Sequence, residues 1–353
     1  MGFYRSEEMK IAVFYNLPSG GAKRALFAQL DYLSQKNKVF LFQPDELEKT
    51  KLPSFLKRLI RDLRIFVQLP VIHKKLAGKI DSLKADVALV HLDYLTQAPY
   101  VLRYLKTPSV YYCQEILRIV YEEELAFKKR VNFLKRLYEQ ATRYLRKVVD
   151  RKNARNADRI IVGTRYIKRA VMKAYGKSAD VCPMGADSEV FKPLGEKKKK
   201  QVLFVGEKNK ISGYHFAKKA LNLIKNEVRP KLKVISFSSG KPKLTDAELA
   251  KEYSRSLLTL CTSYHEPFGL VAVESMASGT PVLAVNEGGY KETVVDGKTG
   301  YLLEREPKKF AEKIEYLAGN KEKALALGMK GREHVLKNFN WKKHGECLEK
   351  LLK

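Results

Sequence analysis

Cysteine is scarce in this chain of 353 residues. The four cysteines, Cys113, Cys182, Cys261 and Cys347, are widely spaced and form no CxxC pair. We therefore expect neither a disulfide framework nor a zinc site, and no metal or cofactor is assigned. This usage is typical of a reducing compartment.

Long apolar runs are absent as well. No stretch approaches the ~18–20 apolar residues that a membrane-spanning helix needs. The N-terminus, MGFYRSEEMK, is polar and lacks the apolar segment of a signal peptide. We therefore expect a cytoplasmic protein.

Acidic residues are outnumbered: 68 Lys and Arg stand against 39 Asp and Glu, a formal net charge of +29. Such an excess indicates an anionic partner, which can be a nucleic acid, an anionic membrane surface or a phosphorylated substrate. No RNA- or DNA-binding motif is evident, and the aromatic residues do not alternate with a basic stripe. Nucleic acid is therefore not expected as a partner.

The positive charge gathers in two segments of the first half of the chain. Residues 51–79 hold 8 Lys or Arg against one Asp, and residues 128–159 hold 12 against 3 Asp or Glu. At ~100° per residue, one side of a helix in the second segment is apolar and the other is basic. Its apolar side is formed by Val131, Leu134, Leu137, Tyr138, Ala141, Tyr144, Leu145 and Val148. Two interpretations stay open: this side packs on its own domain, or it docks on anionic lipid.

Short apolar runs alternate with helical patterns throughout the chain. A strand at 10–15 is followed by the turn at Gly20 and Gly21 and by a helix over 22–36. Further strands are expected at 38–42, 85–91, 109–113, 157–163, 201–206, 232–237, 257–261, 280–285 and 300–303. This alternation predicts an α/β protein built from parallel sheets.

Each half of the chain has the content of one doubly wound, Rossmann-like domain. We expect a first domain over 1–194, a second over 195–335 and a final helix over 336–353. In such a pair the carboxyl ends of the two sheets face each other across a cleft, where ligands bind.

The segment 263–282 is the richest in chemistry. Pro267 suits a helix start, Gly269 permits close approach to a ligand, and Gly279 ends the helix. The N-terminus of that helix is an anion site. Glu266 and Glu274 bracket it, and carboxylates accept hydrogen bonds from vicinal diols. The pattern favours a ligand that carries hydroxyl groups on both sides of a diphosphate.

This segment resembles the E-x7-E motif of retaining glycosyltransferases with the GT-B fold, the group 1 family. Residues 288–294 and 296–302 are similar to the segments that follow in that family. The resemblance implies that Glu274 binds the ribose hydroxyls of a nucleotide-sugar donor and that Glu266 contacts its hexose. It also implies that the backbone N–H groups of Phe268, Gly269 and Leu270 meet the sugar and the diphosphate.

The resemblance extends to loops of the first half. It places Gly20 and Gly21 beside the donor on the acceptor side, where Lys23 and Arg24 add positive charge. It also places Gln114 near the anomeric centre, where many relatives have a histidine. Glutamine cannot act as a general base. The nearest ionisable alternative is Glu115, which could instead form an ion pair with Arg118. His91, at the end of an expected strand, is predicted to line the cleft.

The loop after Gly206 departs from the family pattern. Relatives carry an arginine directly after this glycine and a lysine five residues later, where this chain has Glu207 and Ser212. Lys208 and Lys210 are close enough in sequence to supply the positive charge from shifted positions.

The resemblance implies transfer of a hexose, with retention, from a nucleotide-diphospho-sugar to a glycan or lipid-linked acceptor. Cell-envelope polysaccharide or glycolipid synthesis is the expected setting, with docking on the inner face of the membrane through 51–79 and 128–159. By the same resemblance, we expect the first half to bind the acceptor, the second half to bind the donor and the last helix to return to the first domain. The alternative is a catalytically silent relative that acts as a binding partner.

Overall fold

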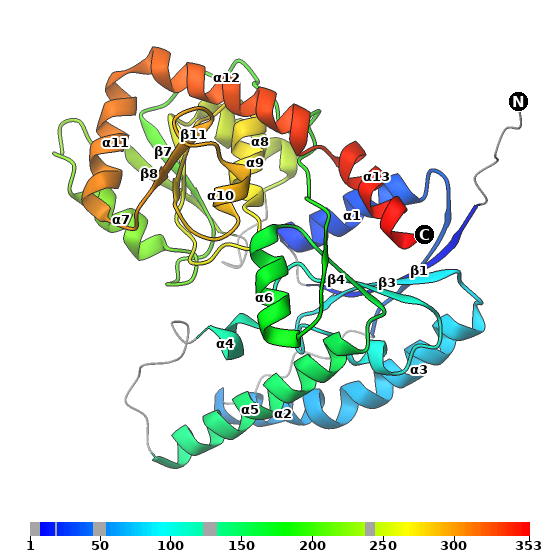
Figure 1. Ribbon diagram of the computed structural model, residues 1–353. Coiled ribbons are helices and arrows are strands. Elements are labelled where there is room, and N and C mark those ends of the chain that lie inside the picture. Colours follow the sequence, from blue (N-terminus) through cyan, green and yellow to red (C-terminus); the bar gives the residue numbers. More distant parts are fainter. Residues whose placement is uncertain (1–7, 18–19, 45–53, 123–132, 237–243) are drawn as a thin grey trace, which may run out of the picture.

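The computed structural model describes residues 8–17, 20–44, 54–122, 133–236 and 244–353. Two sheets, each covered by helices, lie side by side in Figure 1. All strand pairs within both sheets are parallel. The predicted α/β fold with two doubly wound sheets is confirmed.

The first sheet has the strand order β2-β1-β3-β4-β5-β6. Its strands are β1 (Lys10–Asn16), β2 (Lys38–Phe42), β3 (Val87–Asp93), β4 (Ser109–Tyr112), β5 (Arg159–Val162) and β6 (Asp180–Val181). Its helices are α1 (Gly21–Leu33), α2 (Ser54–Leu63), the π-helical η1 (Arg64–Gln68), α3 (Leu69–Ser82), the 3-10 helix η2 (Tyr100–Arg103), α4 (Arg118–Tyr121), α5 (Phe133–Arg155) and α6 (Arg165–Tyr175). The sequence did not predict β6, because two residues are too short to show a pattern.

The second sheet has the strand order β11-β10-β9-β7-β8. Its strands are β7 (Gln201–Val205), β8 (Lys231–Ile235), β9 (Leu258–Cys261), β10 (Val282–Val285) and β11 (Gly300–Leu303). The helices that follow are α7 (Tyr214–Asn222), α8 (Asp246–Arg255), α9 (Leu270–Ala277), α10 (Tyr290–Thr293), α11 (Pro307–Gly319), α12 (Lys321–Asn338) and α13 (Trp341–Leu352).

The buried strand β1 shows how the helices divide between the two faces of the first sheet. Successive side chains of a strand point to opposite faces. Ile11 and Val13 pack in the same cluster as Leu26 of α1, whereas Ala12 and Phe14 pack with Ala77 of α3. Strand and helix therefore bury complementary apolar surfaces, which excludes water from both faces.

The C-terminal helix α13 returns to the first domain and lies against α1 (Figure 1). A Cβ atom on Gly345 would lie 2.2 Å from the ring of Tyr32, so only glycine permits this approach. The side chains of Gln29 and His344 are hydrogen-bonded at 2.9 Å. Where the chain crosses back, the N–H of Ala186 donates to the carbonyl of Phe339 at 2.9 Å. Two chain segments therefore connect the domains side by side.

Candidate active site

The loop between β9 and α9 carries Glu266, and closely packed glycines fix its backbone. Gly269 has a φ of 98°, and a Cβ atom there would lie 2.8 Å from the Tyr290 ring. A Cβ atom on Gly288 would lie 2.5 Å from the carbonyl oxygen of Glu266. The N–H of Gly289 donates to that same oxygen at 2.7 Å. The glycine pair after β10 therefore supports the loop that presents Glu266.

Arg305 braces the start of the same loop, a role that the sequence did not reveal. Its guanidinium donates to the carbonyls of Thr262 and Ser263 at 2.8 and 3.1 Å. Its other bonds go to Glu287 at 2.8 and 2.6 Å, and it stacks 3.6 Å from the Tyr264 ring centroid. A charge-assisted fork of this kind fixes backbone that is in neither helix nor strand.

Glu266 lies where the two domains meet. Burial raises the pKa of Glu266, and the positive charge of Arg118 offsets part of that rise. Hydrogen bonds from the Ser263 side chain and from the backbone N–H groups of Gly269 and Phe268 also lower this pKa. Arg118 belongs to the first domain and donates to the carbonyl of Tyr264 at 2.5 Å. The N–H groups of Phe268 and Gly269, expected to meet the donor, thus face Glu266 here. Phe268 itself is buried, and a Cβ atom on Gly163 would lie 3.5 Å from its ring.

Glu115 shares this acidic environment. Burial raises the pKa of Glu115 to about 7; Arg118 lowers it and the nearby charge of Glu266 raises it further. The guanidinium of Arg118 bonds to both carboxylate oxygens of Glu122 at 3.1 Å, so the direct ion pair of Arg118 is with Glu122. Glu115 is therefore a carboxyl group that changes protonation near neutral pH, close to Glu266.

Gln114 lies on the other side of this region. Its amide donates to the carbonyl of Ala22, at the start of α1, at 3.4 Å. This contact connects the loop after β4 to the loop that contains Gly20 and Gly21. Both loops follow strands of one parallel sheet, so they lie at the same edge of it.

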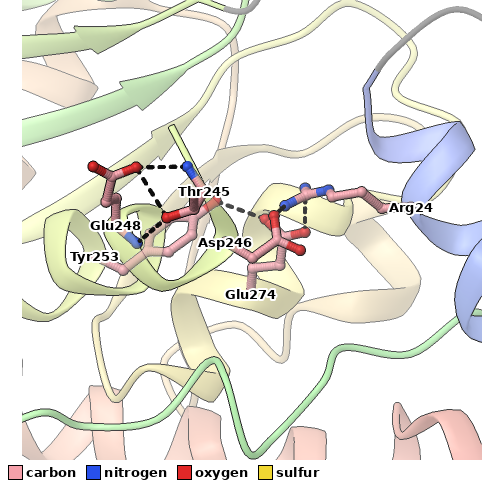
Figure 2. Close-up of polar contacts among 6 residues, drawn as sticks. All are labelled: Arg24, Thr245, Asp246, Glu248, Tyr253 and Glu274. Carbon is pink, nitrogen blue, oxygen red and sulfur yellow. Dashed lines mark hydrogen bonds and ion pairs between the residues drawn. The ribbon is translucent and has the colours of Figure 1, made fainter. Parts of the chain in front are cut away.

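Glu274, on α9, is buried with 5% of its side chain exposed. Tyr253 of α8 donates its hydroxyl to Oε2 of Glu274 at 3.0 Å. Arg24, on α1 of the first domain, reaches Oε1 at 2.5 Å (Figure 2). Burial raises the pKa of Glu274, whereas Arg24 and Tyr253 lower it. Both oxygens of this carboxylate therefore have a hydrogen-bond donor.

A cavity of about 460 Å³ opens beside Glu274. From the first domain it is lined by Gly20, Gly21 and Arg24, and from the second by Leu270 and Glu274, among others. Residues singled out in the sequence of both domains thus share one cavity that is large enough for part of a nucleotide sugar.

The lining does not include the other predicted residues Glu266, Phe268, Gly269, Gln114 and Glu115. The predicted residues after β7 do not join it either. Among the described residues, the lining of the cavity includes neither Gly206 nor Lys208 nor Lys210. Lys208 places its ammonium 6.0 Å from the ring centroid of Tyr214. Glu207 accepts a hydrogen bond from the hydroxyl of Ser236 at 2.7 Å.

The prediction for His91 was wrong. Strand β3 continues past it to Asp93, and His91 is fully buried inside the first domain. Its ring lies 5.4 Å from that of Tyr112, and burial lowers its pKa to about 3. His91 is a neutral core residue and does not line a cleft.

Helices α2 and α5 form a surface on the first domain, where they run along its lower edge in Figure 1. They contact each other through polar groups. Arg58 pairs with Glu139 at 2.7 Å, and Asp62 accepts from Tyr138 at 2.6 Å and from Arg146 at 2.5 Å. Polar contacts therefore hold these helices together.

The apolar side chains of this surface point outward instead. Phe133 and Leu134 are each 77% exposed and Leu137 is 54% exposed. Other exposed apolar side chains on these two helices are Leu56, Leu59, Leu63, Tyr144, Leu145 and Val148, and Val67 of η1 and Val71 of α3 are exposed as well. The interpretation in which this side packs on its own domain is thus wrong for Leu134, Leu137, Tyr144, Leu145 and Val148, whereas Tyr138 of the same side bonds to α2. Residues 51–53 and 128–132 of the predicted segments lie outside the described part. No helix in that part is long and apolar enough to cross a membrane.

Residues 241–334 match the family described as glycosyl transferases group 1. The chain is 31% identical to spore coat protein SA of Bacillus subtilis (strain 168), over 46% of this chain and 51% of that protein. It is 26% identical to a D-inositol 3-phosphate glycosyltransferase of Corynebacterium kroppenstedtii, over 56% of this chain and 53% of that protein. It therefore spans about half the length of these curated relatives.

Solved structures resemble the whole chain. A sucrose-phosphate synthase from Thermosynechococcus elongatus superposes with a TM-score of 0.76 at 20% identity, over 98% of both chains. Anabaena HepE in complex with UDP-glucose gives a TM-score of 0.69 at 18% identity, over 98% of this chain and 99% of that one. At these identities the likeness shows the fold, which is GT-B.

Proposed function

Because the second domain of this chain belongs to the group 1 glycosyl transferases and the whole chain has the GT-B fold, we propose that it transfers a hexose from a nucleotide-diphospho-sugar. The acceptor is a glycan or lipid-linked acceptor, and the anomeric configuration is retained. One observation carries the proposal: Glu274 and Leu270 of α9 line one cavity with Gly20 and Gly21 of the other domain, and Glu266 lies in the loop just before that helix. UDP-glucose bound by the structurally similar HepE supports a nucleotide sugar as the donor.

Each acidic residue has a separate task in this proposal. Glu274 accepts hydrogen bonds from the ribose hydroxyls, and Glu266 contacts the hexose. The N-terminus of α9, between them, stabilises the charge that develops on the leaving diphosphate. The cavity between the domains limits the access of water, which would otherwise hydrolyse the donor.

Calorimetric titration with uridine- and guanosine-diphospho-sugars tests the donor site. We expect saturable binding by the wild type, and a loss of about 100-fold or more in Glu274→Ala, because two hydrogen bonds to a charged group disappear. Glu312→Ala, which changes an exposed acid on α11, is the matched control and should bind as the wild type does. A folded wild-type protein that binds no donor would instead favour a catalytically silent relative.

Glu115 gives the transfer reaction a pH dependence. If its carboxylate accepts the proton of the acceptor hydroxyl, only the ionised form works, and that form is lost below a pKa of about 7. We expect kcat/KM to rise about tenfold per pH unit up to about pH 7 and then to level off. In Glu115→Gln the rate should be lower and this rise should vanish. An unchanged profile in the variant would exclude Glu115 as the base.

The surface of α2 and α5 supports an acceptor that is carried by a membrane. Residues 54–82 and 133–155, which span these helices together with η1 and α3, hold 15 Lys or Arg against 4 Asp or Glu. Exposed apolar side chains surrounded by basic ones are typical of a helix that lies in an anionic lipid interface. A second copy of the chain would bring the same positive charge and repel the first. We therefore propose that the protein docks on the inner, anionic face of a membrane, where it serves polysaccharide or glycolipid synthesis.

Vesicle sedimentation tests this docking. The wild type should sediment with phosphatidylcholine vesicles that contain 30% phosphatidylglycerol, and at least tenfold less with pure phosphatidylcholine. The change of Leu134 and Leu137 together to glutamate should weaken binding about tenfold or more, because apolar contact is replaced by charge of the wrong sign. The control Leu325→Glu alters a side chain on α12 that is 60% exposed and should have no effect. A wild-type dimer that this double change dissociates would contradict lipid docking.

A further inference from the structure

Arg24 of α1 crosses from the first domain and occupies the carboxylate that the donor is expected to use. Its guanidinium bonds to Glu274 at 2.5 Å and to Asp246 at 2.7 Å (Figure 2). Burial alone would lower the pKa of Arg24, but the two carboxylates outweigh burial and keep it above its ordinary value. Arg24 is therefore always charged, and the two acids of the second domain hold it.

In this arrangement a ribose cannot reach Glu274. Tyr253 is bonded to Oε2 and Arg24 to Oε1. Each oxygen keeps a second lone pair, but with both donors in place only 5% of the Glu274 side chain is exposed, so vicinal hydroxyls reach the carboxylate only if one of these donors moves away. Tyr253 is fully buried, whereas the Arg24 side chain is 28% exposed and borders the cavity. Arg24 is thus the donor that can move.

A displaced Arg24 remains beside the cavity. It lies in the first turn of α1, next to Gly20 and Gly21, which line the same cavity. A Cβ atom on Gly21 would lie 3.2 Å from the Leu270 side chain, so the N-termini of α1 and α9 approach each other there. Both helix ends favour a negative ligand. A guanidinium at this position can form two parallel hydrogen bonds to a phosphate.

Few cations are available to a diphosphate in this cavity. Among the described residues, the basic side chains that line it are Lys23 and Arg24, and the lining includes neither Lys208 nor Lys210 of the loop after β7. We propose that Arg24 exchanges partners when the donor binds: the ribose hydroxyls displace it from Glu274, and its guanidinium then binds the donor's diphosphate. This inference rests on the proposed function and adds that the first domain supplies a diphosphate ligand.

In this exchange Arg24 competes with the ribose of the donor for Glu274 and binds the diphosphate of the donor. Calorimetry separates the two roles. The donor titration identifies the nucleobase, uracil or guanine. The affinity for the corresponding nucleoside is then compared with the affinity for its diphosphate, at pH 8 so that Glu274 stays ionised. In Arg24→Met the affinity for the nucleoside should rise about fivefold, because a partly exposed ion pair no longer has to be broken. The affinity for the diphosphate should fall about tenfold, because a charge-assisted contact is lost.

Two further variants distinguish the exchange from a purely structural ion pair. Asp246→Asn removes one partner of Arg24 but keeps the guanidinium, so the affinities for nucleoside and diphosphate should both rise about two- to threefold. Lys251→Met removes an exposed positive charge from α8, the helix that carries Asp246, but Lys251 does not line the cavity. That variant should therefore leave the affinity for the nucleoside unchanged.

The outcomes are distinct. Opposite shifts for nucleoside and diphosphate in Arg24→Met establish the exchange. Equal losses for both ligands in that variant would overturn it and make Arg24 a structural link between the domains. A wild type that binds no nucleotide at all would refute the proposed donor site itself, and this inference with it.

Discussion

Replacing Glu266 with glutamine is expected to slow sugar transfer by about 100- to 1000-fold, while the affinity for the nucleoside diphosphate stays within about twofold of the wild type. The carboxylate lies at the start of α9, beside Arg118, and in the proposed site it contacts only the hexose. A contact of that kind acts on the reacting sugar and not on the nucleotide, so its loss lowers kcat. Single-turnover transfer assays and calorimetry with the free diphosphate measure the two effects separately.

Stability is the control for this experiment. Burial raises the pKa of Glu266, so the folded protein favours the neutral carboxyl group more than the unfolded chain does. A neutral glutamine of the same shape should therefore leave the free energy of unfolding nearly unchanged. If Glu266→Gln weakens the binding of the diphosphate as strongly as Glu274→Ala does, Glu266 serves to hold α9 in place and has no role of its own toward the hexose.

The elements of this fold were predictable because each strand is a short apolar run. Such runs followed by turn residues and helical patterns indicate parallel strands whatever the rest of the chain does. The positions of Gly20, Gly21, Glu266 and Glu274 were also predictable, since all follow the carboxyl ends of strands or lie on the next helix. Topology alone brings the two glycines to the carboxyl edge of the first sheet and the two acids to that of the second.

Contacts between the domains were not predictable in the same way. Arg24 and Glu274 are 250 positions apart in the sequence, and Arg118 and Tyr264 are 146 apart. A long basic side chain can pair with any acid within its reach, so its residue type says little about its partner. The sequence placed Arg24 near the glycine loop, but only the packing of two domains brings it to Glu274.

Helix α5 shows a second limit of prediction from the sequence. The pattern along it predicted one apolar and one basic side, which the structure contains. It could not tell which residues face the domain, because Asp62 on α2 accepts hydrogen bonds from Tyr138 of the apolar side and from Arg146 of the basic side. The described aliphatic residues of the apolar side remain exposed. His91 shows the converse, since a polar residue inside a strand gives no local sign that another helix will cover it.

Gly213→Ala is expected to destabilise the protein by about 3–5 kcal/mol, the range that only severe steric or packing defects reach. Gly213 has a φ of 73° at the start of α7. A Cβ atom there would lie 1.9 Å from the carbonyl oxygen of Thr262 and 2.5 Å from its carbonyl carbon. These are backbone atoms, and Arg305 holds the same carbonyl at 2.8 Å, so they cannot move aside cheaply.

Gly297→Ala is the matched control, because Gly297 has a φ of 69° but nothing within 4 Å of a Cβ atom. This substitution should lower the free energy of unfolding by about 1–2 kcal/mol, because alanine must then adopt the left-handed backbone conformation of Gly297. Urea unfolding followed by circular dichroism measures both variants, and the difference between them is the cost of the overlap alone. Equal losses of stability in the two variants would mean that the loop after β9 can move away from the new Cβ atom at no free-energy cost. In that case Thr262 would shift together with the loop that follows it, and Gly213→Ala should displace Glu266 and lower the transfer rate even where the fold survives.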